Sequence, residues 1–530
     1  MRINILEALS DNITVDSQKC TTCGTCVERC ILDNLRLKLA PCRQACPLNV
    51  NCQGYVQLIL RGLEEEALEM VERELPFPAI LGRLCSAQCE GNCHRKNIEG
   101  QAVAIRTLKR YVSDVATDAP SRVPAKAPAT GKHCAVVGAG PAGMLAAFDL
   151  LVKGHAVSIY DAEQEPGGML RWAIPAFRLP GEVLAAEWAK LTALGVSFFG
   201  GQTLGRDISL QQLNDQHDAV IVAIGCSRPK HLGIEGEDAD GVIHALDLLH
   251  QVRDNQRPQM GRNIVVIGGG DVALDAAQTA LRLGAERVLT VSLESRDILP
   301  ASAEALELAE REGVELDGSW GPTRILTKNG RVSDVELQRC LAVFDALGRF
   351  APRFDECSLK TVPADTVIIA IGQVQDPALA DEADGCDPMT LRKGDQPIFW
   401  AGDVVGGSST IVEAMASGRW AAESVHRLFS GQHMTYGRAY PGPNETEFEI
   451  DTSRGSADGR VSPKWLPFAG PERFGEVEAV LTEAEARREA GRCYGCGAPF
   501  GKYRTCWFCL PCEVECPHDA LWVQIPYLLR

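Results

Sequence analysis

The stretch CAVVGAGPAGMLAAFDLLVKGHAVSIYDA, residues 134–162, decides the fold of the central region of this chain. An apolar run, typical of a buried parallel strand, leads into Gly138, Gly140 and Gly143. The first glycine permits a tight turn, the second lets the backbone approach a pyrophosphate, and the third lets the next helix pack closely on the strand. A second strand ends at Asp161, which is placed to accept hydrogen bonds from a ribose. We therefore predict a dinucleotide-binding domain here.

The stretch NIVVIGGGDVALDAAQTALRLGAERVLTVSLESRD, residues 263–297, repeats this pattern. Its turn carries Gly268 and Gly270, Asp271 opens the expected helix, and Ala273 occupies the third small position. Two such motifs in one chain indicate two dinucleotides, one a flavin and one a nicotinamide. The fold class is therefore α/β, with two Rossmann-like domains.

The composition excludes several kinds of partner. The chain has 530 residues, 45% hydrophobic residues and a net charge of −17 without a long basic run, which argues against nucleic acid or an anionic membrane as the main partner. We see no signal peptide and no run of about 18 apolar residues, so we expect no membrane span and a cytoplasmic location. Most of the 21 cysteines fall in tight C-x-x-C spacings, which favours metal binding over disulfides.

Ferredoxin-type cysteine spacing, C-x2-C-x2-C-x3-C, occurs near both ends of the chain. The two runs are Cys20, Cys23, Cys26 and Cys30, and Cys506, Cys509, Cys512 and Cys516. In two-cluster ferredoxins the fourth cysteine of each run binds the cluster of the other run. We therefore predict that the two ends meet, with Cys516 completing the first [4Fe–4S] site and Cys30 the second. The alternative is that each run holds its own cluster, and zinc, whose structural sites rarely use this spacing, is the competing metal.

Several further stretches carry a family resemblance. Residues 40–59, 75–110, 167–180 (GGMLRWAIPAFRLP) and 268–275 (GGGDVALD) together resemble the small subunit of bacterial glutamate synthase and the N-terminal half of dihydropyrimidine dehydrogenase. These are NAD(P)H-dependent iron–sulfur flavoproteins, and the match covers roughly residues 40–430. The resemblance implies FAD, a nicotinamide substrate and [4Fe–4S] clusters as cofactors.

PIFWAGDVVGGSSTIVEAMASGRWAAESV, residues 397–425, resembles the segment that completes the FAD domain in two-dinucleotide flavoprotein reductases. The resemblance assigns FAD to the first glycine motif and places Gly402 and Asp403 at the ribityl chain, before a helix from about Thr410. Gly167 and Gly168 resemble the pyrophosphate loop of the same enzymes. VIVAIG (220–225) and VIIAIG (367–372) look like paired strands where the chain crosses between domains, so the nicotinamide domain is inserted in the FAD domain.

These patterns divide the chain into eight expected segments. In order they are a half-ferredoxin (1–39), a helical [4Fe–4S] domain (40–115), a Pro-, Ala- and Ser-rich linker (116–131), the first segment of the FAD domain (132–240), the NAD(H) domain (241–363), the second segment of the FAD domain (364–430), an extended segment (431–472) and a C-terminal ferredoxin-like segment (473–530).

The nicotinamide specificity is predicted from the end of the second motif. In the family this strand usually ends in Tyr-Arg-Arg, whose arginines hold the 2′-phosphate of NADPH, whereas this chain has Ser292, Leu293 and Glu294, followed by Arg296. A glutamate accepts hydrogen bonds from a free 2′-hydroxyl and repels a 2′-phosphate. We expect NAD(H), the alternative being a solvated Glu294 with Arg296 binding the phosphate.

The helical region supplies the remaining cluster ligands. By resemblance, Cys42, Cys46, Cys89 and Cys93 form one cluster, and Cys85 belongs to a second. The C-x-x-C pair that precedes Cys42 in the family is missing here, and Cys493 and Cys496 near the C-terminus look like that pair moved to the other end. Cys52 is the expected fourth ligand of the second cluster. Sixteen cysteines then make four clusters.

We therefore predict an NADH:acceptor oxidoreductase, an electron-transfer subunit that links NAD(H), FAD and a chain of [4Fe–4S] clusters to a partner enzyme or ferredoxin. No catalytic side chain is expected, because the hydride step belongs to the cofactors. The alternatives are a flavin-based bifurcating subunit and a stand-alone enzyme of the glutamate synthase small-subunit type. The family's partners, glutamate synthase large subunit, 2-oxoacid oxidoreductases, tungsten or molybdenum enzymes and dissimilatory sulfite reductase, are candidates, and a homodimer is left open.

Overall fold

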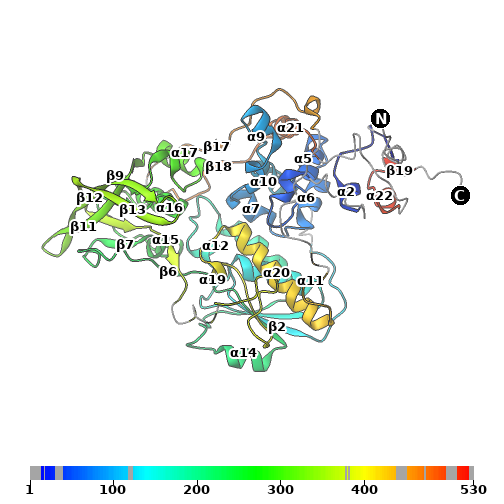
Figure 1. Ribbon diagram of the computed structural model, residues 1–530, viewed down its shortest axis with the longest axis horizontal. Coiled ribbons are helices and arrows are strands. Elements are labelled where there is room, and N and C mark those ends of the chain that lie inside the picture. Colours follow the sequence, from blue (N-terminus) through cyan, green and yellow to red (C-terminus); the bar gives the residue numbers. More distant parts are fainter. Residues whose placement is uncertain are drawn as a thin grey trace.

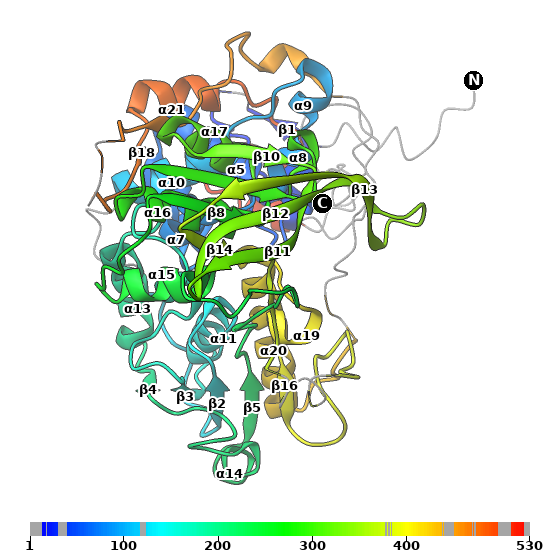
Figure 2. The same cartoon turned by 90° about the vertical axis from the view of Figure 1, so that its left-hand side faces the viewer.

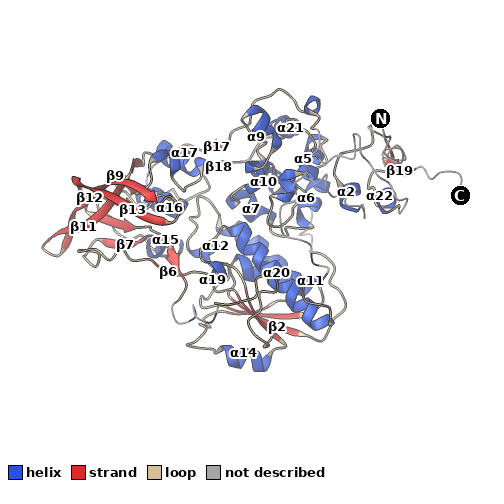
Figure 3. Cartoon of the chain, in the orientation of Figure 1, coloured by secondary structure: helices blue, strands red, loops and turns tan. Residues whose placement is uncertain are grey.

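A computed structural model of the chain describes residues 13–16, 18–29, 40–116, 123–376, 379, 382, 384–436, 438, 450–468, 470, 473–496 and 510–523. In Figure 1 one α/β domain lies below a helical domain and the other lies to its left, and a small lobe built from both ends of the chain lies to its right. Helices make up the upper centre, whereas both α/β domains contain helices and strands (Figure 3). Within these described ranges, no helix is long and apolar enough to cross a membrane.

The first α/β domain is built on a five-stranded parallel sheet. Its strand order is β16 (Ile398–Trp400), β5 (Ala219–Val222), β2 (His133–Val137), β3 (Ala156–Tyr160), β4 (Ser197–Phe199). Its helices are α11 (Pro141–Val152), α12 (Met169–Trp172), α13 (Gly181–Ala193), α14 (Leu210–Gln216), α19 (Asp403–Gly406) and α20 (Ile411–Ser430). Every residue of β5 is buried, as expected for a strand covered on both faces. A Cβ at Gly418 would overlap the Ala142 carbonyl oxygen, so α20 packs directly on α11.

The second α/β domain carries another five-stranded parallel sheet. The strand order is β10 (Glu315–Gly318), β9 (Arg287–Ser292), β8 (Asn263–Ile267), β14 (Thr366–Ile369), β7 (Val242–His244). The domain also contains α15 (Ala245–Arg253), α16 (Asp271–Arg282), η3 (Arg296–Ile298) and α17 (Ala303–Glu312). A three-stranded antiparallel sheet of β11 (Trp320–Lys328), β12 (Arg331–Phe344) and β13 (Phe350–Pro363) packs against it (Figure 2).

The chain crosses between these domains at a point other than the one expected. VIVAIG forms β5 in the first sheet, whereas VIIAIG forms β14 in the second sheet, so the two runs are not paired. The strands that pair at the crossing are β6 (Arg228–Pro229) and β15 (Gln373–Val374), which are antiparallel. The expected boundary at residue 363 therefore falls one strand too early. An apolar run shows that a strand is buried but not which sheet buries it.

The expected helical domain over residues 40–115 is present. Its helices are α4 (Pro41–Gln44), α5 (Cys52–Leu60), α6 (Glu64–Glu72), α7 (Pro78–Leu84), α8 (Gln88–Gly91), α9 (His94–Glu99) and α10 (Ile105–Val115). α21 (Glu483–Ala490), from near the C-terminus, packs on α5 and α10. Arg492, which follows α21 in the sequence, is buried and forms an ion pair with Glu489 of α21 at 2.7 Å. Glu489 also accepts a hydrogen bond from the Ala104 N–H at 2.8 Å. Residues 481–496 therefore belong to the helical domain.

The two ends of the chain form one lobe, as the half-ferredoxin interpretation predicts. β1 (Ile13–Val15) pairs antiparallel with β19 (Leu521–Val523). α2 (Thr25–Arg29) lies against α22 (Pro511–Val514), and Arg29 forms an ion pair with Glu515 at 2.6 Å. After α20 the returning chain contains η4 (Thr452–Arg454) and the short antiparallel pair of β17 (Lys464–Trp465) and β18 (Glu478–Ala479), which lies between α17 and the helical domain (Figure 1).

Candidate functional site

The first glycine turn connects β2 to α11 in the way the sequence predicts. Gly138 has a φ of +106°, and a Cβ there would overlap the Ala223 carbonyl oxygen. A Cβ at Gly143 would overlap the Gly138 carbonyl oxygen, which explains why the helix requires glycine at this position. Gly140 is open, because an added Cβ would meet only the Gly168 Cα, at 3.9 Å. The free space therefore lies at Gly140, at the N-terminus of α11, where a phosphate binds most favourably.

Asp161 lies at the end of β3 and braces this turn. Its carboxylate accepts the Ala139 N–H at 2.6 Å and the Glu163 N–H at 2.8 Å. Burial raises the pKa of Asp161, and the two N–H groups oppose that shift. Each carboxylate oxygen retains a free lone-pair direction, so the predicted ribose contact stays compatible with these bonds.

Residues 397–425 bring a second helix N-terminus, that of α20, next to the first glycine turn. Gly402, with a φ of +75°, closes β16 beside Ala142, and Asp403 accepts the Ser409 N–H at 3.1 Å and its hydroxyl at 2.5 Å. Thr410 caps α20 in a capping box with Glu413. The loop of Gly167 and Gly168 lies against the first glycine turn, where the Gly167 N–H donates to the Ala139 carbonyl at 3.1 Å. The predicted flavin residues are thus gathered at the carboxyl ends of β2, β3 and β16.

The second glycine turn, between β8 and α16, has the same backbone geometry as the first. A Cβ at Gly268, whose φ is +148°, would overlap the Ala370 carbonyl oxygen, Gly270 is open, and Ala273 is fully buried. Asp271 accepts the Ser302 N–H at 2.9 Å and so ties α16 to the start of α17.

Glu294 and Arg296 follow β9 at the edge of this turn. The Glu294 carboxylate lies close to Gly269, 3.3 Å from the position of an added Cβ. Arg296 is exposed and makes a bidentate ion pair with Glu310, with a shortest distance of 2.7 Å. Glu294 therefore faces the glycine turn, whereas the Arg296 guanidinium is already held by a carboxylate.

The predicted cysteines of the helical domain line two pockets. Site A is lined by Cys42, Cys93, Cys493 and Cys496. Site B is lined by Cys46, Cys52, Cys85 and Cys89. Cys52 also reaches the pocket of site A, so the two sites are adjacent. The C-terminal pair Cys493 and Cys496 thus enters the helical domain as predicted.

The pockets divide these cysteines differently from the expected ligand sets. Cys42 and Cys46 were expected to share a cluster, as were Cys89 and Cys93, but each pair is split between site A and site B. Side chains four residues apart share a face only on a continuous helix. α4 ends at Gln44, before Cys46, and Cys93 follows the end of α8 with an extended backbone. The helix breaks therefore send the members of each pair to different pockets.

Site C lies in the terminal lobe. Cys20, Cys23, Cys26 and Cys516 line one pocket, the combination expected for two half-ferredoxins. Burial and the neighbouring thiols raise the pKa of Cys26. Cys512 lies in the core of the same lobe, whereas the other members of the predicted fourth set, Cys30, Cys506 and Cys509, lie outside the described residues.

Polar side chains connect the sites in a fixed order. Val412, in the first turn of α20, lines site B, and Gln88 next to Cys89 donates to Glu413 at 2.9 Å. Gln57 joins sites A and C, because its amide contacts the Cys493 carbonyl at 3.5 Å and accepts the Thr22 hydroxyl at 2.9 Å. The sites therefore follow one another from the flavin region outward as B, A and C.

Sequence reasoning missed the cation beside site B. Lys109 of α10 lines this pocket and is buried. Burial lowers its pKa, but the nearby thiols, Cys85 first, more than compensate and raise it. A buried ammonium at this place offsets the negative charge of thiolates. Only the tertiary fold shows this role, because in the sequence Lys109 is one of several basic residues on an amphipathic helix.

Two Rossmann-like domains, each with a glycine-rich turn, are connected by two chain crossings, and this arrangement defines a two-dinucleotide oxidoreductase. The cysteine sites add an iron–sulfur module. The chain belongs to the pyridine nucleotide-disulphide oxidoreductase family, whose model matches residues 132–418. Residues 6–120 match the model of dihydropyrimidine dehydrogenase domain II, 4Fe-4S cluster. The predicted fold class and family resemblance are confirmed, and the protein is an iron–sulfur flavoprotein oxidoreductase of the NAD(P)H-dependent kind.

Named relatives cover most of the chain. The NADP(+)-dependent formate dehydrogenase subunit beta of Moorella thermoacetica is 32% identical over 86% of this chain and 70% of its own length. The glutamate synthase [NADPH] small chain of Azospirillum brasilense is 34% identical over 73% of this chain and 85% of its own. The NAD-dependent dihydropyrimidine dehydrogenase subunit PreT of Escherichia coli O157:H7 is 31% identical over 74% and 92%. These relatives are subunits of larger redox enzymes.

Proposed function

We propose that this protein is an NADH:acceptor electron-transfer subunit that conducts electrons between a flavin and a redox partner at its terminal lobe. The observation that carries the proposal is the order of the thiol sites. Site B adjoins the first turn of α20, site A adjoins site B through Cys52, and Gln57 joins site A to site C. A stand-alone enzyme has no need of a path that leads away from its flavin.

The donor sets fit iron–sulfur clusters. A [4Fe–4S] cluster takes four cysteine thiolates, and each of the three pockets offers four. Site A has four cysteines without Cys52, whereas site B has only three without it, so we assign Cys52 to site B. A fourth cluster, held by Cys506, Cys509, Cys512 and Cys30, completes the scheme.

Bound FAD would supply hydride chemistry with the nicotinamide, and bound clusters would supply single-electron transfer. The residues of this chain would bind and orient these cofactors. The open backbone at Gly140 and the α11 N-terminus hold the FAD pyrophosphate, and Gly270 with α16 does the same for the nicotinamide dinucleotide. The first turn of α20, whose Val412 lines site B, would hold the flavin next to that site.

Iron analysis and reduction assays test this proposal. We expect about 16 iron atoms per chain, and NADH should reduce both the flavin and the clusters under anoxic conditions. Clusters that stay oxidised while NADH reduces the flavin would contradict the proposed path. About 8 iron atoms per chain would rule out the four-cluster scheme.

A nicotinamide preference follows from Glu294. We expect the wild type to use NADH with a kcat/KM at least about 10-fold above that for NADPH, because Glu294 faces the glycine turn and repels a 2′-phosphate. Glu294→Gln should shrink this ratio mainly by improving NADPH. Steady-state kinetics with both nucleotides provides the measurement.

A matched variant, Glu310→Gln, distinguishes the role of Glu294 from that of Arg296. It frees Arg296 from its ion pair and leaves Glu294 in place. If Arg296 is the phosphate ligand, NADPH use should rise sharply in this variant alone. A wild type that prefers NADPH would overturn the NADH assignment. The relatives are named for both nucleotides, so the family alone does not decide it.

We infer a redox protein as the partner, either a ferredoxin or the catalytic subunit of a larger enzyme, since the relatives are named as subunits. An anoxic pull-down with the holoprotein identifies it. A bifurcating subunit is the second candidate, because sites B, A and C offer one exit from the flavin: NADH would deliver two electrons, one would leave along these sites to ferredoxin, and the other would go to a second acceptor. In that case ferredoxin reduction by NADH should require a second acceptor of higher potential.

A further inference from the structure

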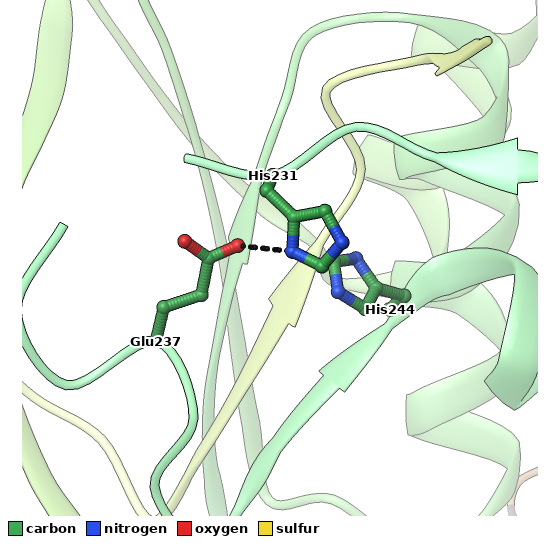
Figure 4. A group of neighbouring side chains, drawn as sticks. All are labelled: His231, Glu237 and His244. Carbon is green, nitrogen blue, oxygen red and sulfur yellow. Dashed lines mark hydrogen bonds and ion pairs between the residues drawn. The ribbon is translucent and has the colours of Figure 1, made fainter. Parts of the chain in front are cut away.

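Outside the flavin and thiol sites, three potential metal ligands meet in one loop. His231, Glu237 and His244 each present one ligand atom, and these atoms lie within 4.8 Å of one another (Figure 4). His231 Nδ1 is 3.1 Å from Glu237 Oε1, and the two imidazole rings are 5.0 Å apart, nearly perpendicular. The group plays no role in the chemistry proposed above.

We propose that His231, Glu237 and His244 form a Zn²⁺ site with three protein ligands. Two imidazoles and a carboxylate are a ligand set that zinc uses when it keeps one position for water. In tetrahedral geometry, with bonds of about 2.0–2.1 Å, neighbouring ligand atoms are about 3.4 Å apart, so the present spacing needs only small side-chain rotations.

The surroundings of the three ligands support this assignment. Glu237 Oε1 accepts the Leu232 N–H at 2.9 Å and Oε2 accepts the Gly233 N–H at 2.6 Å, which orients the carboxylate from behind as outer partners do in metal sites. Within the described residues, His244 Nδ1 is buried without a hydrogen-bond partner. A metal would supply that partner.

The position of the ligands indicates what the metal would do. His231 follows β6, one of the two strands that cross between the α/β domains, and His244 ends β7, the edge strand of the second sheet. Bound zinc would fasten the crossing strand to the nicotinamide domain. We therefore expect zinc to stabilise this domain against heat and to leave iron content unchanged.

The test uses the holoprotein with its clusters intact, freed of loosely bound metal by EDTA and dialysed against Zn²⁺ without oxygen. We expect one zinc per chain, and X-ray absorption should show nitrogen and oxygen ligands near 2.0–2.1 Å rather than sulfur near about 2.3 Å. His244→Ala and Glu237→Gln should each weaken binding by more than about 10-fold. His433→Ala, at an exposed histidine elsewhere, is the matched control.

His231→Ala covers the case in which the His244 variant fails to fold, because the His231 side chain is 67% exposed and its removal leaves no cavity. Sulfur ligation, no retained zinc, or equal binding by wild type and His231→Ala would each overturn the site. The proposal is independent of the electron path, because zinc binding is measured without turnover.

Discussion

A Cys493→Ser variant should contain about four fewer iron atoms per chain than the wild type while keeping its flavin. Cys493 lines site A, together with Cys496 and with Cys42 and Cys93 from the N-terminal part of the sequence. Serine lacks the thiolate that holds an iron–sulfur cluster. Because site A lies between sites B and C, NADH should still reduce the flavin, but electron delivery to an acceptor at the terminal lobe should fall by more than about 100-fold.

Cys357→Ser is the matched control, because Cys357 is exposed on β13 and lines none of the thiol sites. It should retain full iron content and full activity. An unchanged iron content in Cys493→Ser would show that this residue is no ligand. Unchanged delivery to the acceptor, with iron lost, would show that the path bypasses site A.

Gly143→Ala should destabilise the first α/β domain by about 3 kcal/mol and yield protein without flavin. The added methyl group would overlap the Gly138 carbonyl oxygen, which belongs to a tight turn that cannot move away. Thermal unfolding followed by circular dichroism and flavin absorbance of the purified protein provide the measurements.

Gly140→Ala separates binding from folding at the same turn. Gly140 has a φ of −75°, which alanine adopts freely, and an added Cβ would have no protein atom closer than 3.9 Å. We expect stability within about 0.5 kcal/mol of the wild type but FAD affinity at least about 10-fold lower, because the methyl group enters the space predicted for the pyrophosphate. Full FAD affinity in this variant would place the cofactor elsewhere.

The dinucleotide domains were predictable because their signal is local. In each motif a buried strand, three small residues and a helix occupy one continuous stretch, so Gly138 and Gly268 have the positive φ that the turn requires. The start of α20 was predictable for the same reason, since Thr410 and Glu413 form a capping box. The meeting of the two ends also followed from local spacing, combined with the exchange of the fourth cysteine in ferredoxins.

The division of the cysteines between sites A and B could not be predicted in this way. It depends on where two short helices end, within one residue or two, and sequence patterns place helix ends least reliably. Cys52 illustrates the point, since it lies at the start of α5 and lines both pockets. The His231, Glu237 and His244 group was missed because its spacing matches no familiar metal motif, and only the turn between β6 and β7 gathers it.

The pairing of β1 with β19 has a consequence for biosynthesis. Cys20, Cys23 and Cys26 leave the ribosome early, but their fourth partner, Cys516, is made far later, and site A waits for Cys493 and Cys496. With the proposed clusters, neither site could be filled during most of translation. Metal insertion would then wait for the full-length chain, and a chain cut short would lack ligands for both clusters.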